Sequence, residues 1–173
     1  QAPSYKNSQP WEVAIVSGEK REALSQQLVA LLEDGVKPEP DIPEPASWPA
    51  AVQKRIDDLL TKKGAACGMD LTSPELGDRA KKAKLNSYQA PTDIYLYQDA
   101  ALSAWSIFDA GLFAQSLMLA AHAHGLGSVP QAFCIDYSPE IKRFLGIPAS
   151  KRLLLALSID YPLTEHPANS FRT

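Results

Sequence analysis

The sequence has 173 residues, with 17 basic and 20 acidic side chains and a net charge of −3. This balance argues against a basic nucleic-acid groove, so no nucleic-acid partner is predicted. With 45% hydrophobic residues, the chain can bury a sizeable core, and a single domain over residues 1–173 is expected.

The cysteines and the apolar runs argue against a disulfide-rich, metal-binding, membrane or secreted protein. Cys67 and Cys134 are far apart and outside any CxxC pattern, so neither a disulfide framework nor a metal site is predicted. No apolar run is expected to reach the roughly 18 residues of a membrane helix, and no signal region is evident. We therefore expect a cytoplasmic protein with no membrane contact.

The first half of the chain predicts one strand followed by helices. Leucines recur at helical spacing after the strand, and five prolines then form a spacer before a charged amphipathic segment. In order, the expected elements are a buried strand at 11–17, a helix at 19–34, a proline-rich spacer at 38–49, a helix at 50–63 and a helix capped by Ser73.

The second half predicts strands that alternate with helices around one dominant helix. Residues 103–124 are nearly uncharged and apolar all round, which predicts a helix in the centre of the fold. The other expected elements are a strand at 93–98, a short strand or loop at 128–133, a helix at 138–145 and a strand at 151–160 buried on both faces. This order predicts an α+β or α/β layout with one sheet packed on the central helix.

Several weak motifs do not support a catalytic or metal site. Gly125-x-Gly127 closes a helix, whereas a dinucleotide-binding turn follows a strand and opens a helix. His122 and His124 are two apart on a helix, roughly 200° around its axis, so they cannot share a metal ion. His166 has no nearby acid or thiol pattern that would indicate a triad.

Three segments remain as candidates for function. They are a proline-framed polar loop before the first strand (PSYKNSQPW, 3–11), a small-residue turn (GLGSVPQAF, 125–133) and the tail NSFR (169–172). The first offers donors and acceptors at a strand mouth, the second allows close backbone approach to a flat ligand, and the third offers an arginine to a phosphate. Each also has a plain interpretation, as a capped turn, a helix-to-strand turn and an exposed arginine.

Taken in order, these blocks resemble a known family. PSYKNSQPW, APTDIYLY, FDAGLFAQSLMLAAHAHGLGSVP, LGIP, LLLALSIDYP and NSFR are together similar to the FMN-dependent nitroreductase superfamily over nearly the entire chain. The resemblance implies an α+β fold with a nitroreductase-like mixed sheet around a long buried central helix and a helical lid excursion at 36–88. It also implies a homodimer whose two FMN sites are shared between subunits.

The resemblance assigns expected roles to individual residues. Asp109 and Gln115 match positions that we interpret as packing or interface polar groups. The lid predicts aromatic substrate contacts at Trp48 and Tyr88, with plain packing of the excursion as the alternative. The residues expected to bind FMN are Ser4, Tyr5, Asn7 and Gln9 in the first loop, Pro130, Gln131 and Ala132 in the turn, and Ser170 and Arg172 in the tail.

The implied activity is transfer of hydride from NADH or NADPH through FMN to a small nitroaromatic or quinone-like acceptor. A flavin needs an apolar slot and a few placed donors, and the protein need not supply a catalytic acid–base pair. The alternatives are a flavin-dependent reductive dehalogenase or flavin-fragmenting enzyme of the same fold, and a flavin-binding protein without turnover.

One family feature is absent from the printed sequence. Family members carry a helix and an arginine-rich segment ahead of the first loop, where the arginines grip the FMN phosphate. Three explanations are open: the chain is a fragment or processed piece, an N-terminal part is unnumbered, or flavin binding is lost. The first two are favoured because Gln1 is not an initiator methionine and the loop is otherwise intact.

Overall fold

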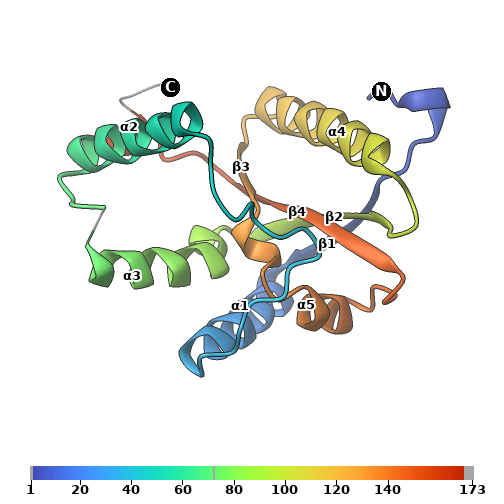
Figure 1. Ribbon diagram of the computed structural model, residues 1–173, viewed down its shortest axis with the longest axis horizontal. Helices are drawn as coiled ribbons and strands as arrows, with labels where there is room; N and C mark the ends of the chain where they lie inside the picture. Colours follow the sequence, from blue (N-terminus) through green and yellow to red (C-terminus); the bar gives the residue numbers. More distant parts are fainter. Residues whose placement is uncertain (1, 72, 170–173) are drawn as a thin grey trace. The chain divides into compact units, whose positions relative to one another are not determined.

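The computed structural model describes residues 2–71 and 73–169, and its strands form one sheet in the order β1-β2-β4-β3 (Figure 1). All pairings between these strands are antiparallel, and the α+β prediction is confirmed. The strands are β1 (Glu12–Ser17), β2 (Thr92–Asp99), β3 (Gly127–Gln131) and β4 (Lys151–Asp160). The α-helices are α1 (Gly18–Glu33), α2 (Ala50–Cys67), α3 (Pro74–Leu85), α4 (Ala104–Ala123) and α5 (Ser138–Leu145).

The sheet separates two layers of helix. Figure 1 shows α4 on one face of the sheet and α1 and α5 on the other. Leu24, Leu28 and Ile141 pack with buried residues of the sheet on the α1 and α5 side. Leu96 and Leu157 pack with α4 on the opposite side. The fold therefore has two apolar layers, and the sheet contributes side chains to both.

The helix boundaries follow local signals in the sequence. α1 ends where Gly35 adopts a left-handed φ of +70°, and the N–H of Val36 donates to Leu31 O at 2.9 Å, as in a Schellman motif. The predicted cap of α3 is confirmed, because Ser73 Oγ accepts a hydrogen bond from the N–H of Leu76 at 3.3 Å. α2 continues to Cys67, four residues beyond its predicted end.

Burial along α4 differs from the prediction of a fully buried central helix. Ala110 and Ala114 are buried against the sheet, but Trp105, Phe108 and Leu119 are 66%, 62% and 59% exposed. These three side chains form an apolar stripe along α4 that a single chain leaves exposed. The chain alone therefore buries only one side of this helix.

α4 also corrects the expectation about apolar length. In the described part of the chain it is the helix long and apolar enough to cross a bilayer, with a mean hydropathy of 1.2. The expectation that no run reaches this length is therefore wrong. Length and composition do not separate a bilayer helix from a core helix, and α4 packs on β2 and β3.

The first strand was predicted to be buried, and this is also wrong. β1 is an edge strand of the sheet, and its Val13 and Ile15 are 41% and 66% exposed. Val16 alone of its six residues is buried, at 2% exposure. The apolar β-branched run therefore predicted a strand correctly, but it did not predict that the strand lies at the edge of the sheet.

The chain divides into two compact units. The first contains the described residues up to Pro43 together with Lys82–Tyr161, and the second contains the described residues of Glu44–Lys81 and those from Pro162 to Asn169. Residues 36–43 and 82–88 of the predicted lid thus belong to the first unit, and 44–81 to the second. The single-domain and lid assignments stay predictions.

A strap at residues 36–41 ties the start of the proline-rich segment to the first unit. Asp41 Oδ1 forms an ion pair with Lys142 of α5 at 2.9 Å, and Asp41 Oδ2 accepts the N–H of Leu153 in β4 at 2.8 Å. The N–H of Asp41 donates to Ser138 Oγ at 3.1 Å, and Tyr137 Oη donates to Val36 O at 3.2 Å. One carboxylate therefore satisfies both an ammonium and a backbone N–H.

Replacement of Asp41 should destabilise the first unit. Asp41→Ala leaves Lys142 and the N–H of Leu153 without this acceptor, so we expect a loss of about 1–3 kcal/mol in the free energy of unfolding, measured by urea titration. The control is Glu33→Ala, which breaks the exposed Lys82–Glu33 pair and should change little. Equal losses in the free energy of unfolding in the two variants would contradict the conclusion that the strap stabilises the first unit.

The two cysteines should react very differently with thiol reagents. Burial raises the pKa of the Cys134 thiol to about 12, whereas Cys67 is half-buried. Since the thiolate is the nucleophile, Ellman's reagent at pH 8 should modify one thiol in the native protein and two in urea. Fast modification of Cys134 in the native state would show that the core around it is open.

Candidate functional site

The predicted cofactor loop is a short strained turn ahead of β1. Tyr5–Asn7 form a 3₁₀ turn, and Lys6, Asn7 and Gln9 have left-handed φ angles of 51°, 55° and 45°. A non-glycine residue in this region costs about 1–3 kcal/mol, so other contacts must hold the loop in this shape.

Asp109 of α4 supplies the main contacts that hold the loop. The N–H of Tyr5 donates to both carboxylate oxygens of Asp109, at 3.1 and 3.0 Å, and Ser8 Oγ donates at 3.4 Å. Asp109 is only 3% exposed. Asp109 was interpreted from sequence as a packing or interface group, and its role as loop anchor was missed. The available signal was its position as an acid in a nearly uncharged helix.

Hydrogen bonds within the loop fix its polar side chains. The N–H of Gln9 donates to Ser4 Oγ at 3.1 Å, and Gln9 Nε2 donates to Asn7 Oδ1 at 2.9 Å. Both amide side chains are exposed and Ser4 is half-buried. The structure therefore brings Ser4, Asn7 and Gln9 together as one polar group.

Aromatic and cationic groups lie beside this polar group. Tyr5 is 57% exposed and its ring stacks with Trp105 of α4, with centroids 6.0 Å apart. Lys6 Nζ lies 5.4 Å from the centre of the Tyr5 ring. The loop thus presents amide, aromatic and ammonium groups to the surface.

The cofactor contacts predicted in the second segment are the last two residues of β3 and the residue that follows it. Pro130 and Ala132 are exposed, whereas the side chain of Gln131 is 6% exposed and donates from Nε2 to Ser158 Oγ at 2.5 Å. Any contact of Gln131 with a surface ligand must therefore come from its backbone. Ser170 and Arg172 lie outside the described residues.

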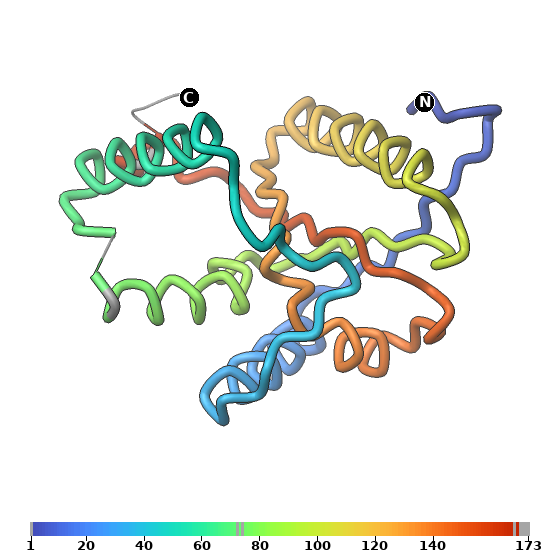
Figure 2. Tube along the Cα trace, viewed as in Figure 1, coloured from blue at the N-terminus to red at the C-terminus, as the bar shows by residue number. Residues whose placement is uncertain are grey.

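The two segments lie at opposite edges of the sheet in one chain. The loop precedes edge strand β1 and the turn lies at the end of edge strand β3, with β2 and β4 between them. Three steps between neighbouring strands amount to about 14 Å. Figure 2 shows the loop beside the first half of α4, and β3 after the end of that helix. One chain therefore does not bring its own loop and turn together.

Tyr88, a predicted substrate contact, lies in a second strained turn. Ser87, Tyr88 and Gln89 have φ angles of 49°, 51° and 68°. Tyr88 is 49% exposed, and partial burial raises the pKa of its phenol. Trp48 belongs to the second unit and is 46% exposed.

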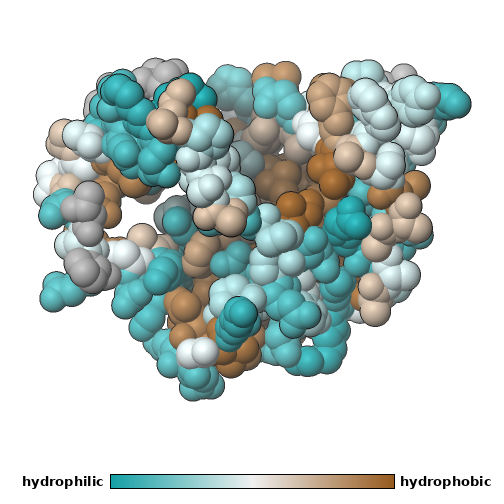
Figure 3. All heavy atoms as spheres, viewed as in Figure 1, coloured by the Kyte–Doolittle hydropathy of each residue, from teal (hydrophilic) through white to brown (hydrophobic). Residues whose placement is uncertain are grey.

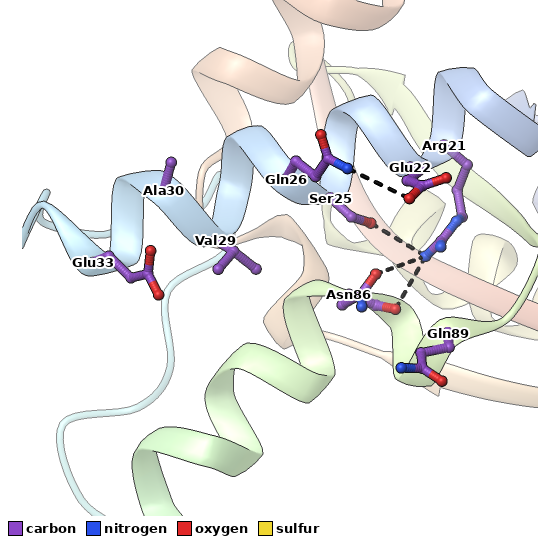
Figure 4. A pocket seen from close by; sticks show the side chains of 9 residues that line it. All are labelled: Arg21, Glu22, Ser25, Gln26, Val29, Ala30, Glu33, Asn86 and Gln89. Atoms are coloured by element: carbon purple, nitrogen blue, oxygen red, sulfur yellow. Dashed lines mark hydrogen bonds between the residues drawn. The ribbon is translucent and has the colours of Figure 1, made fainter.

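A shallow groove of about 510 Å³ lies between α1 and this turn. Figure 4 shows Arg21 at one end of the groove, pointing toward Asn86. Arg21 Nη1 donates to Asn86 O at 3.0 Å, to Asn86 Oδ1 at 3.2 Å and to Ser25 Oγ at 3.3 Å. Arg21 therefore holds the residue that precedes the strained turn.

Removal of the Asp109 carboxylate should release the loop. In Asp109→Ala we expect faster amide hydrogen exchange over residues 4–9, because the N–H of Tyr5 loses both acceptors, and a weaker near-ultraviolet circular dichroism signal from Tyr5 and Trp105. Gln115→Ala is the control, since Gln115 is exposed on the same helix. Unchanged exchange in Asp109→Ala would show that the loop is held by its internal bonds alone.

Comparisons with known proteins agree with this fold. Nitroreductase NfnB of Mycolicibacterium smegmatis is 34% identical, over 92% of this chain and 68% of its own length. A 4-nitrobenzoate reductase of Pseudomonas putida is 30% identical, over 99% of this chain and 75% of its own length. The present chain therefore spans about two thirds to three quarters of these relatives.

A solved crystal structure is also similar to this chain over nearly its full length. The crystal structure of the FMN-dependent nitroreductase NfnB from Mycobacterium smegmatis in complex with NADPH has a TM-score of 0.91 at 31% identity, covering 99% of this chain and 77% of that one. The sequence model of the nitroreductase family matches residues 1–161. This chain therefore belongs to the nitroreductase family.

Proposed function

We propose that this protein is a flavin-dependent oxidoreductase that passes hydride from NADH or NADPH through FMN to nitroaromatic or quinone-like acceptors, and that it works as a cytoplasmic homodimer. The observation that carries the proposal is the loop at residues 4–9, which a buried acid of α4 holds in a strained shape with its amide and aromatic groups outward. Strained backbone of this kind concentrates at ligand sites. Free Cys67 and Cys134 suit a reducing compartment.

The described residues fit the ring and ribityl parts of FMN. Flavin sites combine an apolar surface for the ring with a few placed donors and a cation. The loop offers amide donors on Asn7 and Gln9, a ring surface on Tyr5 and an ammonium on Lys6. The exposed Pro130 and Ala132 offer close backbone approach at the other segment.

The chain's own residues bind and orient rather than transfer protons. FMN, when bound, supplies the redox chemistry by accepting hydride from the nicotinamide and passing electrons to the acceptor. Asn7 and Gln9 would bond to polar atoms of the cofactor, and Asp109 keeps the loop rigid, so that little conformational entropy is lost on binding. Ser170 and Arg172 remain proposed contacts to the phosphate.

A homodimer would complete the site and cover α4. The exposed stripe of Trp105, Phe108 and Leu119 is apolar, and Figure 3 shows apolar side chains reaching the surface in the region of α4. Patches of this kind mark interaction surfaces. Because loop and turn lie at opposite edges of one chain, a twofold pair can place the loop of one subunit beside the turn of the other.

Nitroaromatic acceptors are favoured by the relatives, one of which is a 4-nitrobenzoate reductase. Trp48 and Tyr88 are the proposed aromatic contacts to such an acceptor, and the lid at 36–88 is proposed to carry them. A reductive dehalogenase, a flavin-fragmenting enzyme or a flavin-binding protein without turnover is not favoured by these relatives.

The activity is tested directly on the purified protein. We expect a flavin absorbance band near 450 nm and oxidation of NADH or NADPH that depends on added 4-nitrobenzoate. Retained FMN with no oxidation of either nicotinamide would favour a binding protein, and the absence of flavin uptake would overturn the proposal.

Mixed dimers test whether the site is shared. Asn7→Ala impairs the loop and Ala132→Trp blocks the turn, so each homodimer should be weakly active. When the two variants are expressed together with different tags, one site of each mixed dimer carries an intact loop and an intact turn, and up to half of the normal activity should return. Activity no higher than the average of the two homodimers would place both segments in one chain's site.

A further inference from the structure

A series of buried hydrogen bonds joins the end of β3 to the strained turn at residues 87–89. Asp93 Oδ2 accepts Ser87 Oγ at 2.6 Å, and Asp93 Oδ1 accepts Ser158 Oγ at 2.7 Å. Ser158 Oγ in turn accepts Gln131 Nε2 at 2.5 Å. Asp93, Ser87, Ser158 and Gln131 are 1%, 1%, 4% and 6% exposed. The network therefore lies inside the first unit, out of contact with water.

The strand register places these groups together. Asp93 of β2 is directly opposite Ser158 of β4, and Gln131 of β3 is opposite Ala156, two residues from Ser158 on the same face. A diagonal neighbour of this kind is within reach of a long side chain. The line from Asp93 through Ser158 to Gln131 thus crosses three strands, β2, β4 and β3, and Asp93 joins it to Ser87.

The side chains at the two ends of the network, Gln131 and Ser87, are each held by one hydrogen bond within it. Gln131 Oε1 has no hydrogen-bond partner in the described part of the chain, so the bond from Nε2 to Ser158 is the polar contact that fixes this side chain. Ser87 begins the run of left-handed residues that carries Tyr88, and its hydroxyl bonds to Asp93. A carboxylate has two oxygens, so it can accept one serine hydroxyl on each, and when ionised it has no proton to donate.

Burial raises the pKa of Asp93, while the two serine hydroxyls and the nearby Arg21 guanidinium act in the opposite direction. Arg21 also bonds to Asn86, next to Ser87. The surroundings are therefore built for an acceptor at this position, since a buried carboxylate without such partners is costly.

We propose that Asp93 is a positioning residue that fixes both segments of the site at once, the flavin-side turn at 130–132 through Ser158 and Gln131, and the Tyr88 turn through Ser87. This inference rests on the proposed function for the roles of the two segments. One arm of the network runs from Asp93 through Ser158 to Gln131, and we assign cofactor geometry to it. The other arm runs from Asp93 to Ser87, and we assign acceptor binding to it.

Three substitutions separate the arms. Ser158→Ala should weaken FMN binding about tenfold and shift the flavin absorption spectrum, with KM for 4-nitrobenzoate changed less than twofold; a tenfold change corresponds to about 1.4 kcal/mol. Ser87→Ala should raise that KM about fivefold and leave FMN affinity and spectrum unchanged. Asp93→Asn, which keeps the side-chain volume, should show both effects.

Ser138→Ala is the matched control. Ser138 is also fully buried in the first unit, and among the described residues its hydroxyl bonds only to backbone atoms, those of Ile135 and Asp41. It should lower stability without changing FMN affinity, spectrum or KM. If Ser158→Ala and Ser87→Ala behave like Ser138→Ala, the network is structural only and the inference is wrong.

Hydrogen exchange on the flavin-free protein tests the coupling independently of activity. If Asp93 joins the segments, Asp93→Asn should speed exchange over both residues 86–90 and residues 127–132, whereas Ser158→Ala should speed it over 127–132 and Ser87→Ala over 86–90. Faster exchange of only one of the two segments in Asp93→Asn would overturn the joint role of Asp93. A wild-type protein that takes up no flavin would defeat the proposed function instead, and the exchange result would still decide the role of Asp93.

Discussion

A helix with apolar side chains on two sides is removed from water only when two separate surfaces cover it. α4 is such a helix, and the sheet covers one of its sides. The same helix carries Asp109, which holds the loop, and Phe113, which stacks on Trp11 with ring centroids 4.7 Å apart. The helix that exposes the proposed dimer surface therefore also positions the proposed cofactor loop.

Backbone strain in the described chain is confined to two places. All six non-glycine residues with left-handed φ lie in the segments 6–9 and 87–89. A buried carboxylate bonds to each segment, Asp109 to Ser8 in the first and Asp93 to Ser87 in the second. An acceptor that takes two hydrogen bonds can offset strain of about 1–3 kcal/mol per residue, so these acids preserve shapes that the local sequence disfavours.

Apolar periodicity was enough to predict most elements, and β4 spans Lys151–Asp160 as predicted. Periodicity could not place β1 at an edge, because strand order depends on contacts between distant segments. It could not show that α4 keeps one apolar side open, since composition does not say what covers a surface. The loop residues followed from a motif, but Asp109 acts on Tyr5 across 104 positions, and no local pattern reports such a bond.

The strap at residues 36–41 fixes one of the two points at which residues 44–81 join the first unit. The chain leaves the first unit through Asp41, which is fixed to α5 and β4, and returns where Lys82 pairs with Glu33 of α1. Both of these bonding groups make their contacts within the first unit. Under the proposed function, replacement of residues 44–81 should therefore change acceptor preference while the cofactor framework keeps its contacts.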